Sequence, residues 1–327
     1  TEAFGNAFGA FVQAAHGSRR AKPQLILLGD VLDLQFSRRR DATSNALGFL
    51  KTISPHVSGN VIATAGNHDH ALWTDARLDL FAKAFTATPE MPDYREATPA
   101  FQASGAESRL LSAVLTSAGF NKCDFRYPNL GFSNEKRAVL LHHGHFAEGL
   151  YRTMSHLIDF LEGRQRSTLS VEAISAENGG WIDFLWSAIG EARFGQSAEE
   201  LYQNFLTTTG SRHLTRRWAA QIAGALGDKL PMAGNLVVQD TIHALTLAAL
   251  DQTLGKYRDS ERYTEVMALS TDGLEGLKWY LEGPCLDQLR RELVGDDKPF
   301  DDLPEDITFV LGHTHKPFAK RVAADGY

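Results

Sequence analysis

The sequence predicts an α/β fold interrupted by a long helical insertion. Four short apolar runs have the pattern of strands, and each is followed by a glycine and by residues that commonly bind metals. The long stretch between Gly149 and Ile307 instead places its apolar residues mostly at helical spacing. We therefore expect a core formed by residues 1–149 and 305–327, with a helical cap at residues 150–304 inserted between its two parts.

The core elements follow one another along the chain. A first helix is expected because Phe4, Phe8, Phe11 and Val12 share one helical face. Proline marks a loop at 88–99. The expected helices are 1–15, 45–53 and 107–118, and the expected strands are 25–28, 61–65, 124–128, 138–141 and 307–311.

The cap is expected to consist of helices that pack on one another above the core. They are predicted at 150–161, 179–190, 198–206, 212–226, 237–254 and 273–293, the last interrupted by Gly283 and Pro284. One aromatic stripe, Trp181, Phe184, Leu185 and Trp186, has two interpretations. It either contacts an acyl chain, a nucleobase or a membrane surface, or forms the buried core of the cap.

The distribution of histidines indicates a metal site. Most of the twelve histidines fall in three segments, 66–70, 142–145 and 312–315, each after a strand run. Asp30 follows the first run. Because open α/β sheets place their sites at the carboxyl ends of strands, these residues are expected to meet there. Imidazole, carboxylate and amide ligands without thiolate suit two divalent ions of the Mn, Fe or Zn type.

Four motifs in this order resemble those of the calcineurin-like metallophosphoesterase superfamily. They are Gly-Asp-x-x-Asp at 29–33, Gly-Asn-His-Asp at 66–69, a strand ending in histidine at 142–143, and Gly-His-x-His at 312–315. The resemblance covers roughly residues 22–75, 135–145 and 305–320. It implies a four-layer α/β/β/α sandwich that holds a dinuclear metal centre.

The resemblance assigns ligand roles to individual residues. Asp30 corresponds to the carboxylate that bridges both ions, and Asn67 to a ligand of the second ion. His313 and the strand-end histidine of the third motif are similar to further ligands of that second ion. His315 is similar to a ligand of the first ion.

Two assignments concern the third motif and the catalytic histidine. The resemblance does not distinguish His142 from His143 as the ligand, and the position of His142 nearest the end of the strand slightly favours it. His68 resembles the catalytic histidine that faces phosphate, and Asp69 is expected to orient it. Asp33 is expected to support the site or cap a helix without binding metal.

The family's opening Asp-x-His motif, which supplies ligands of the first ion, does not occur before Gly29. We expect this motif to lie upstream of Thr1, and the chain to be trimmed at both ends. A degenerate site that has lost the first ion is the alternative.

Composition is that of a globular enzyme. The chain has 327 residues, of which 43% are hydrophobic and 22% charged, and its net charge is −7. This acidic balance argues against a general affinity for nucleic acid. Cys123 and Cys285 lack the spacing of metal ligands, so reduced thiols and a cytoplasmic location are expected.

The expected reaction is attack of a metal-bridging hydroxide on phosphorus. The expected substrate is a phosphomonoester, phosphodiester or pyrophosphate of a small molecule or lipid precursor. The alternatives are a non-catalytic scaffold with the same fold, or a nuclease of the same superfamily.

Overall fold

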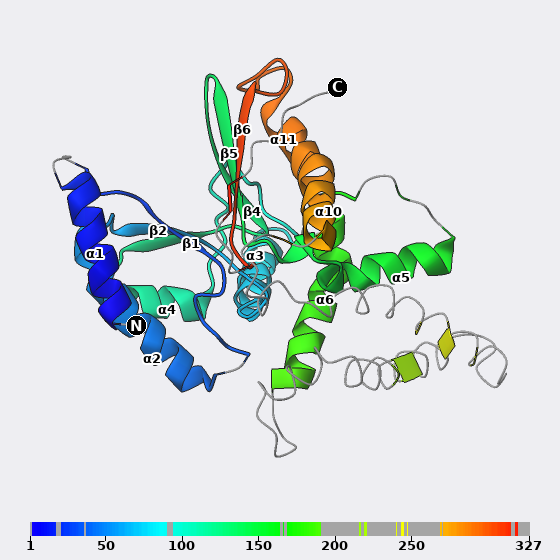
Figure 1. Cartoon of the computed structure of the whole chain (residues 1–327), viewed down its shortest axis with the longest axis horizontal. Helices are drawn as coiled ribbons and strands as arrows, with labels where there is room; N and C mark the ends of the chain where they lie inside the picture. The colour runs from blue at the N-terminus through cyan, green and yellow to red at the C-terminus, as the bar shows by residue number, and fades with distance from the viewer. Residues whose placement is uncertain are drawn as a thin grey trace.

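The computed structural model describes most of the chain and gives it a mixed α/β fold (Figure 1). The described residues are 2–17, 21–35, 37–89, 94–163, 166, 169–190, 216, 219–220, 240, 243–244, 247, 269, 271–314 and 318–319.

The first sheet contains three parallel strands in the order β1-β2-β3. They are β1 Leu25–Leu28, β2 Asn60–Thr64 and β3 Lys122–Phe125. Their apolar runs supply core residues such as Val61 and Ala63, which are almost completely buried. The parallel pairing of β1 with β2 places residues 29–33 beside residues 66–69.

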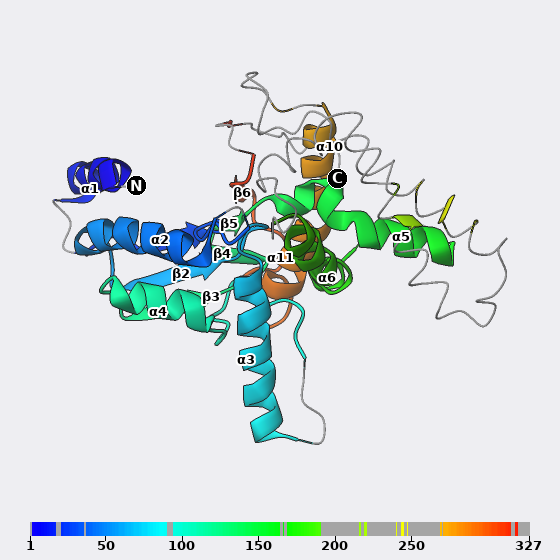
Figure 2. The same cartoon turned by 90° about the horizontal axis from the view of Figure 1, so that it is seen from below.

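Helices cover one face of this sheet. Helix α2 (Arg39–Ile53) and α4 (Arg109–Ser117) lie side by side there, and α1 (Glu2–His16) packs on α2 (Figure 2). The apolar face expected for the first helix is only partly buried. Val12 is buried, whereas Phe4 and Phe11 are exposed, and the Phe8 ring packs at a tilt against the Phe49 ring.

The second sheet has the order β4-β5-β6. Strand β4 (Asn129–Asn134) pairs antiparallel with β5 (Arg137–His142), which pairs parallel with β6 (Asp306–Leu311). Leu286, Leu289 and Leu293 of α11 pack on this sheet. The carboxyl ends of β1, β2, β5 and β6 converge at the centre of the molecule (Figure 1).

The expected cap begins with short turns and two helices. Single turns at η2 (His145–Ala147) and η3 (Gly149–Arg152) lead into α5 (Thr153–Glu162) and α6 (Val171–Gly190). Helix α10 (Thr271–Tyr280) and α11 (Leu286–Leu293) return the chain to β6. Between them Pro284 lies in a wider π-type turn, η6 (Leu281–Cys285), which confirms the predicted interruption.

Several sequence predictions differ from the structure. Helix α3 (Ala71–Ala87) and strand β4 were not predicted, and α6 begins eight residues before the expected 179. Strand β4 has few apolar residues, and its pairing with β5 stabilises it. The helices expected at 198–206, 212–226 and 237–254 lie largely outside the described residues.

The aromatic stripe is buried where the structure describes it. The Trp181 side chain is 5% exposed, and its indole N–H donates to the Leu150 carbonyl oxygen at 2.8 Å. This position favours the cap-core interpretation over contact with a substrate or membrane. The side chains of Phe184, Leu185 and Trp186 lie outside the described part. Within that part, no helix is both long and apolar enough to cross a membrane.

Candidate metal centre

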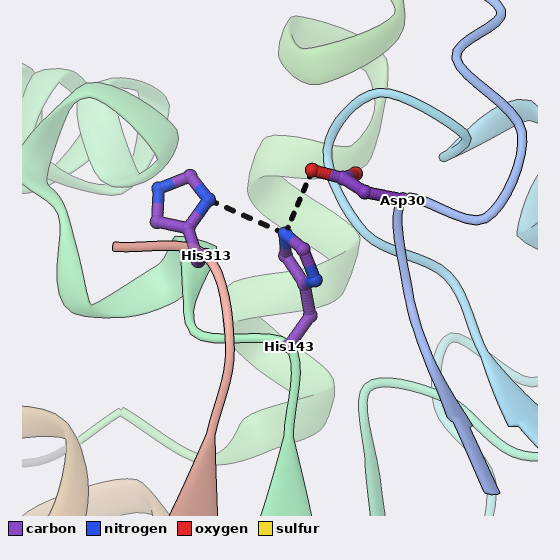
Figure 3. A group of neighbouring side chains, drawn as sticks. All are labelled: Asp30, His143 and His313. Carbon is purple, nitrogen blue, oxygen red and sulfur yellow. Dashed lines mark hydrogen bonds and ion pairs between the residues drawn. The ribbon is translucent and has the colours of Figure 1, made fainter. Parts of the chain in front are cut away.

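Three side chains from three strand ends point toward one another (Figure 3). Asp30 follows β1, His143 follows β5, and His313 follows β6. One ligand atom from each lies within 4.8 Å of the others. Among the described residues this is the one group of at least three acidic, histidine or cysteine side chains close enough to bind a shared ion.

The Nε2 atom of His143 lies at the centre of the group. It is 3.2 Å from Asp30 Oδ2 and 3.3 Å from His313 Nδ1. Asn67, after β2, adds a fourth ligand-type atom, because its Oδ1 lies 3.1 Å from the same Nε2. We call Asp30, Asn67, His143 and His313 the metal group.

The outer nitrogen of each imidazole has a hydrogen-bond acceptor. His143 Nδ1 donates to the Leu28 carbonyl oxygen at 2.8 Å, and His313 Nε2 donates to Glu148 Oε1 at 3.0 Å. In these tautomers the inner nitrogens carry lone pairs that face the group's centre. When His143 Nε2 and His313 Nδ1 carry no proton, two oxygens and two nitrogens converge, an arrangement that a cation stabilises.

Two residues of the metal group have an unusual backbone conformation. Asp30 and His313 have positive φ angles of 53° and 68°, which side-chain-bearing residues seldom adopt. Strain of this kind accumulates at functional sites. Gly66 fits the close approach of the strands, because a side chain there would collide with the Asp30 carboxylate and the His143 ring.

The pKa shifts reflect burial and the tight grouping. Burial alone would raise the pKa of Asp30, but the adjacent His143 outweighs it and holds the pKa well below its ordinary value. Burial would lower the pKa of His143, yet the Asp30 carboxylate raises it. Burial lowers the pKa of His313. Asp30 is therefore ionised, as a metal ligand must be.

His142, which sequence analysis favoured as a ligand, does not contact the metal group. Its ring packs 4.5 Å from the Tyr280 ring, and burial lowers its pKa well below the ordinary value. Neither ring nitrogen has a hydrogen-bond partner among the described residues. Because side chains alternate along β5, His142 faces the interior while the next residue, His143, reaches the metal group.

His68 is oriented by a different acid from the one expected. Its Nδ1 lies 3.2 Å from Asp33 Oδ1, whereas the structure gives no contact with the Asp69 carboxylate. The His68 backbone N–H donates to Asp30 Oδ1 at 2.8 Å, so this histidine adjoins the metal group. Its side chain is 9% exposed.

The Asp69 carboxylate instead holds two ligand loops together. It accepts backbone N–H hydrogen bonds at 2.7–3.2 Å from four residues, namely Gly66, Asp30, Val31 and Leu32. These donors belong to the loops after β1 and β2, which carry Asp30 and Asn67. Asp69 therefore fixes the positions of both ligands without facing a substrate.

Glu148 and Tyr151 also contact the metal group, although the sequence did not predict a role for either residue. Glu148 anchors His313, and the Tyr151 hydroxyl accepts a hydrogen bond from Asn67 Nδ2 at 2.9 Å. Their partners are distant in the sequence, so no local pattern pointed to them. The expected ligand His315 lies outside the described residues.

Two pockets differ in their relation to the metal group. A small pocket adjoins it and is lined by His313, Glu148 and mainly apolar residues, among them Leu277 and Leu311. A larger cavity of about 440 Å³ lies between α4 and β3 and contains no member of the group. Of these two pockets, only the smaller one touches the metal group, at His313.

Comparison with models of known protein families, with curated proteins and with solved structures found no match to this chain. The function must therefore be argued from the motifs and the geometry of the metal group.

Proposed function

We propose that this protein is a metal-dependent phosphoesterase with the four-layer fold of the calcineurin-like superfamily. The observation that carries the proposal is the convergence of Asp30, Asn67, His143 and His313 at four strand ends. Each residue belongs to a motif that resembles the superfamily. Two parallel strand pairs that deliver these motifs to one point are consistent with the proposed fold.

The donor set suits a divalent ion of the Mn, Fe or Zn type. One ionised carboxylate, one amide oxygen and two imidazoles form a mixed oxygen and nitrogen shell. Both imidazoles have an acceptor on their outer N–H, as metal-bound histidines usually do. A second ion would require ligands beyond this group, and His315 is proposed to supply one of them.

Bound divalent ions would polarise the phosphoryl group and lower the pKa of a nucleophilic water. The chain's own residues would then orient the substrate and transfer a proton to the leaving oxygen. His68 adjoins Asp30 through its backbone and is paired with Asp33, so its Nε2 can donate a proton to the leaving oxygen or stabilise developing charge. Asp33 holds the ring in the required orientation.

The proposed substrate is a phosphomonoester, phosphodiester or pyrophosphate of a small molecule. The apolar wall beside His313 suits an apolar part of that molecule better than a nucleic acid backbone. The chain's net charge of −7 also disfavours a polyanion.

A substrate screen tests the proposal. Full-length protein is stripped with chelator, reloaded with Mn²⁺, Fe²⁺ or Zn²⁺, and assayed against aryl phosphomonoester, aryl phosphodiester and pyrophosphate substrates. We expect metal-dependent hydrolysis of at least one class and its loss in Asp30→Asn. Metal binding without hydrolysis of any class would instead indicate a non-catalytic scaffold.

A further inference from the structure

Tyr151 contacts a residue of the metal group from the expected cap. It lies in the η3 turn and is 2% exposed. Its hydroxyl is 2.9 Å from Nδ2 of Asn67, which is completely buried. The hydrogen bond therefore joins the start of the cap to the loop after β2.

In this hydrogen bond Asn67 Nδ2 is the donor and the Tyr151 hydroxyl is the acceptor, so the other end of the carboxamide, Oδ1, faces the metal group. A carboxamide has an oxygen acceptor and a nitrogen donor of nearly the same shape, so a 180° rotation exchanges them in the same space. With Nδ2 donating to Tyr151, Oδ1 lies 3.1 Å from His143 Nε2. The opposite orientation would direct an NH₂ group at the ion and repel it.

The surroundings hold the Tyr151 side chain in place. Its ring packs edge-on against His313 at 5.6 Å and against His145 at 5.7 Å. The preceding residue, Leu150, accepts the Trp181 indole N–H from α6. Because packing fixes the ring, its hydroxyl has a defined position for the Asn67 amide.

We propose that Tyr151 is a positioning residue that holds the Asn67 carboxamide in place, with Nδ2 bonded to its hydroxyl and Oδ1 directed at the bound ion. It acts through Asn67 and is not itself a ligand. The proposal rests on the proposed function, because it requires the metal group to bind a divalent cation. It also makes metal affinity depend on the docking of the cap onto the core.

A double-mutant cycle tests the proposal with Mn²⁺ as the probe. Tyr151→Phe removes only the hydroxyl, and calorimetry measures the Mn²⁺ affinity of the full-length protein. We expect affinity to fall about 10–100-fold, as loss of an outer partner of a ligand usually causes. Asn67→Asp provides two equivalent oxygens that need no orientation. In that background Tyr151→Phe should change affinity much less.

Tyr280→Phe is the matched control, because Tyr280 is also completely buried and its hydroxyl donates to Asn129 Oδ1, outside the metal group. It should leave Mn²⁺ affinity unchanged. The melting temperature of each metal-free variant reports on folding separately from metal binding.

The possible results distinguish failure of the Tyr151 proposal from failure of the proposed function. Equal loss of affinity from Tyr151→Phe in both backgrounds would show that the hydroxyl acts through general packing and would overturn the proposal. Unchanged affinity in Tyr151→Phe would overturn it as well, while leaving the proposed function intact. A wild-type protein that binds no Mn²⁺ would refute the proposed function and this inference together.

Discussion

Asp30 Oδ2 lies 3.2 Å from His143 Nε2, although the two residues follow strands of different sheets. Both side chains are largely buried, so the pair would be costly without a compensating charge or hydrogen bonds. The Leu28 carbonyl oxygen anchors the outer nitrogen of His143, and Asn67 Oδ1 and His313 Nδ1 lie 3.1 and 3.3 Å from its Nε2. This contact brings together two motifs that are far apart in the sequence, the one that contains Asp30 and the one that contains His143.

His143→Ala should remove metal binding, whereas His142→Gln should preserve it. His143 supplies the central nitrogen of the group, and His142 packs on Tyr280 instead. We expect His143→Ala to weaken Zn²⁺ binding by at least about 100-fold, more than loss of an outer partner would. The Zn²⁺ content of each variant after dialysis measures how much metal it retains. Loss of zinc in His142→Gln with the site retained in His143→Ala would reverse the assignment.

His68→Ala should impair turnover without releasing metal. We expect kcat to fall by about 10²–10⁴-fold, the usual contribution of a positioned acid or base. Asp33→Asn should cause a smaller loss, because the His68 ring remains but is less well oriented. Steady-state kinetics and metal analysis are run on the same samples. Release of metal from His68→Ala would make His68 a ligand.

Asp69→Asn should act mainly on stability. The carboxylate accepts four backbone N–H hydrogen bonds, and an amide group would turn an NH₂ toward some of those donors. We expect the free energy of unfolding to fall by about 2–4 kcal/mol, since buried unsatisfied donors cost about 1–3 kcal/mol each. Urea denaturation of the metal-free protein measures this change. The exposed Asp301→Asn is the control, and equal stability of the two variants would contradict the role given to Asp69.

Trp181→Ala should destabilise the fold rather than alter substrate recognition. Its ring is buried and its indole N–H is bonded to Leu150, so truncation is expected to cost about 3–5 kcal/mol. Leu78→Ala, at a side chain that is 55% exposed, should have little effect. Urea denaturation measures the stability of both variants. The KM of each variant for a small aryl phosphate is then compared with its KM for a larger substrate. If Trp181→Ala is stable and raises KM only for the larger substrate, the aromatic stripe contacts the substrate and is not cap core.

Neither cysteine should react in the native protein at pH 8. Burial raises the pKa of Cys123 to about 12 and raises that of Cys285 further above its ordinary value. A raised thiol pKa lowers the fraction of thiolate, the reactive form, at any lower pH. A colorimetric thiol reagent should therefore label both residues only after denaturation. Rapid labelling of native protein would contradict the raised pKa of these thiols.

Most of the strands, though not β4, were predictable from the sequence because short apolar runs are characteristic of strands. Runs at 25–28 and 307–311 correspond to β1 and β6, and the motifs after them identified Asp30 and His313. The turn through Pro284 was also predictable, because proline cannot continue a regular helix.

The remaining features depend on contacts between distant segments. The choice between His142 and His143 depends on which side chain faces the interior at the end of β5, and the sequence does not specify this. The partnership of His68 with Asp33 rather than Asp69 depends on how the two ligand loops pack. Tyr151 meets Asn67 only after the cap docks. Sequence patterns therefore located the residues of the metal group, except for the choice between His142 and His143, whereas tertiary packing determined the residues that position them.

The most direct test of the central claim is anomalous X-ray diffraction from crystals of the full-length protein grown with Zn²⁺. We predict an anomalous peak at about 2.0–2.2 Å from Asp30 and from His143 Nε2, the usual Zn²⁺ ligand distances. Asn67 and His313 should complete the same site, and the peak should vanish in His143→Ala. A zinc-loaded crystal with its peaks elsewhere, and none at Asp30 and His143, would contradict the account.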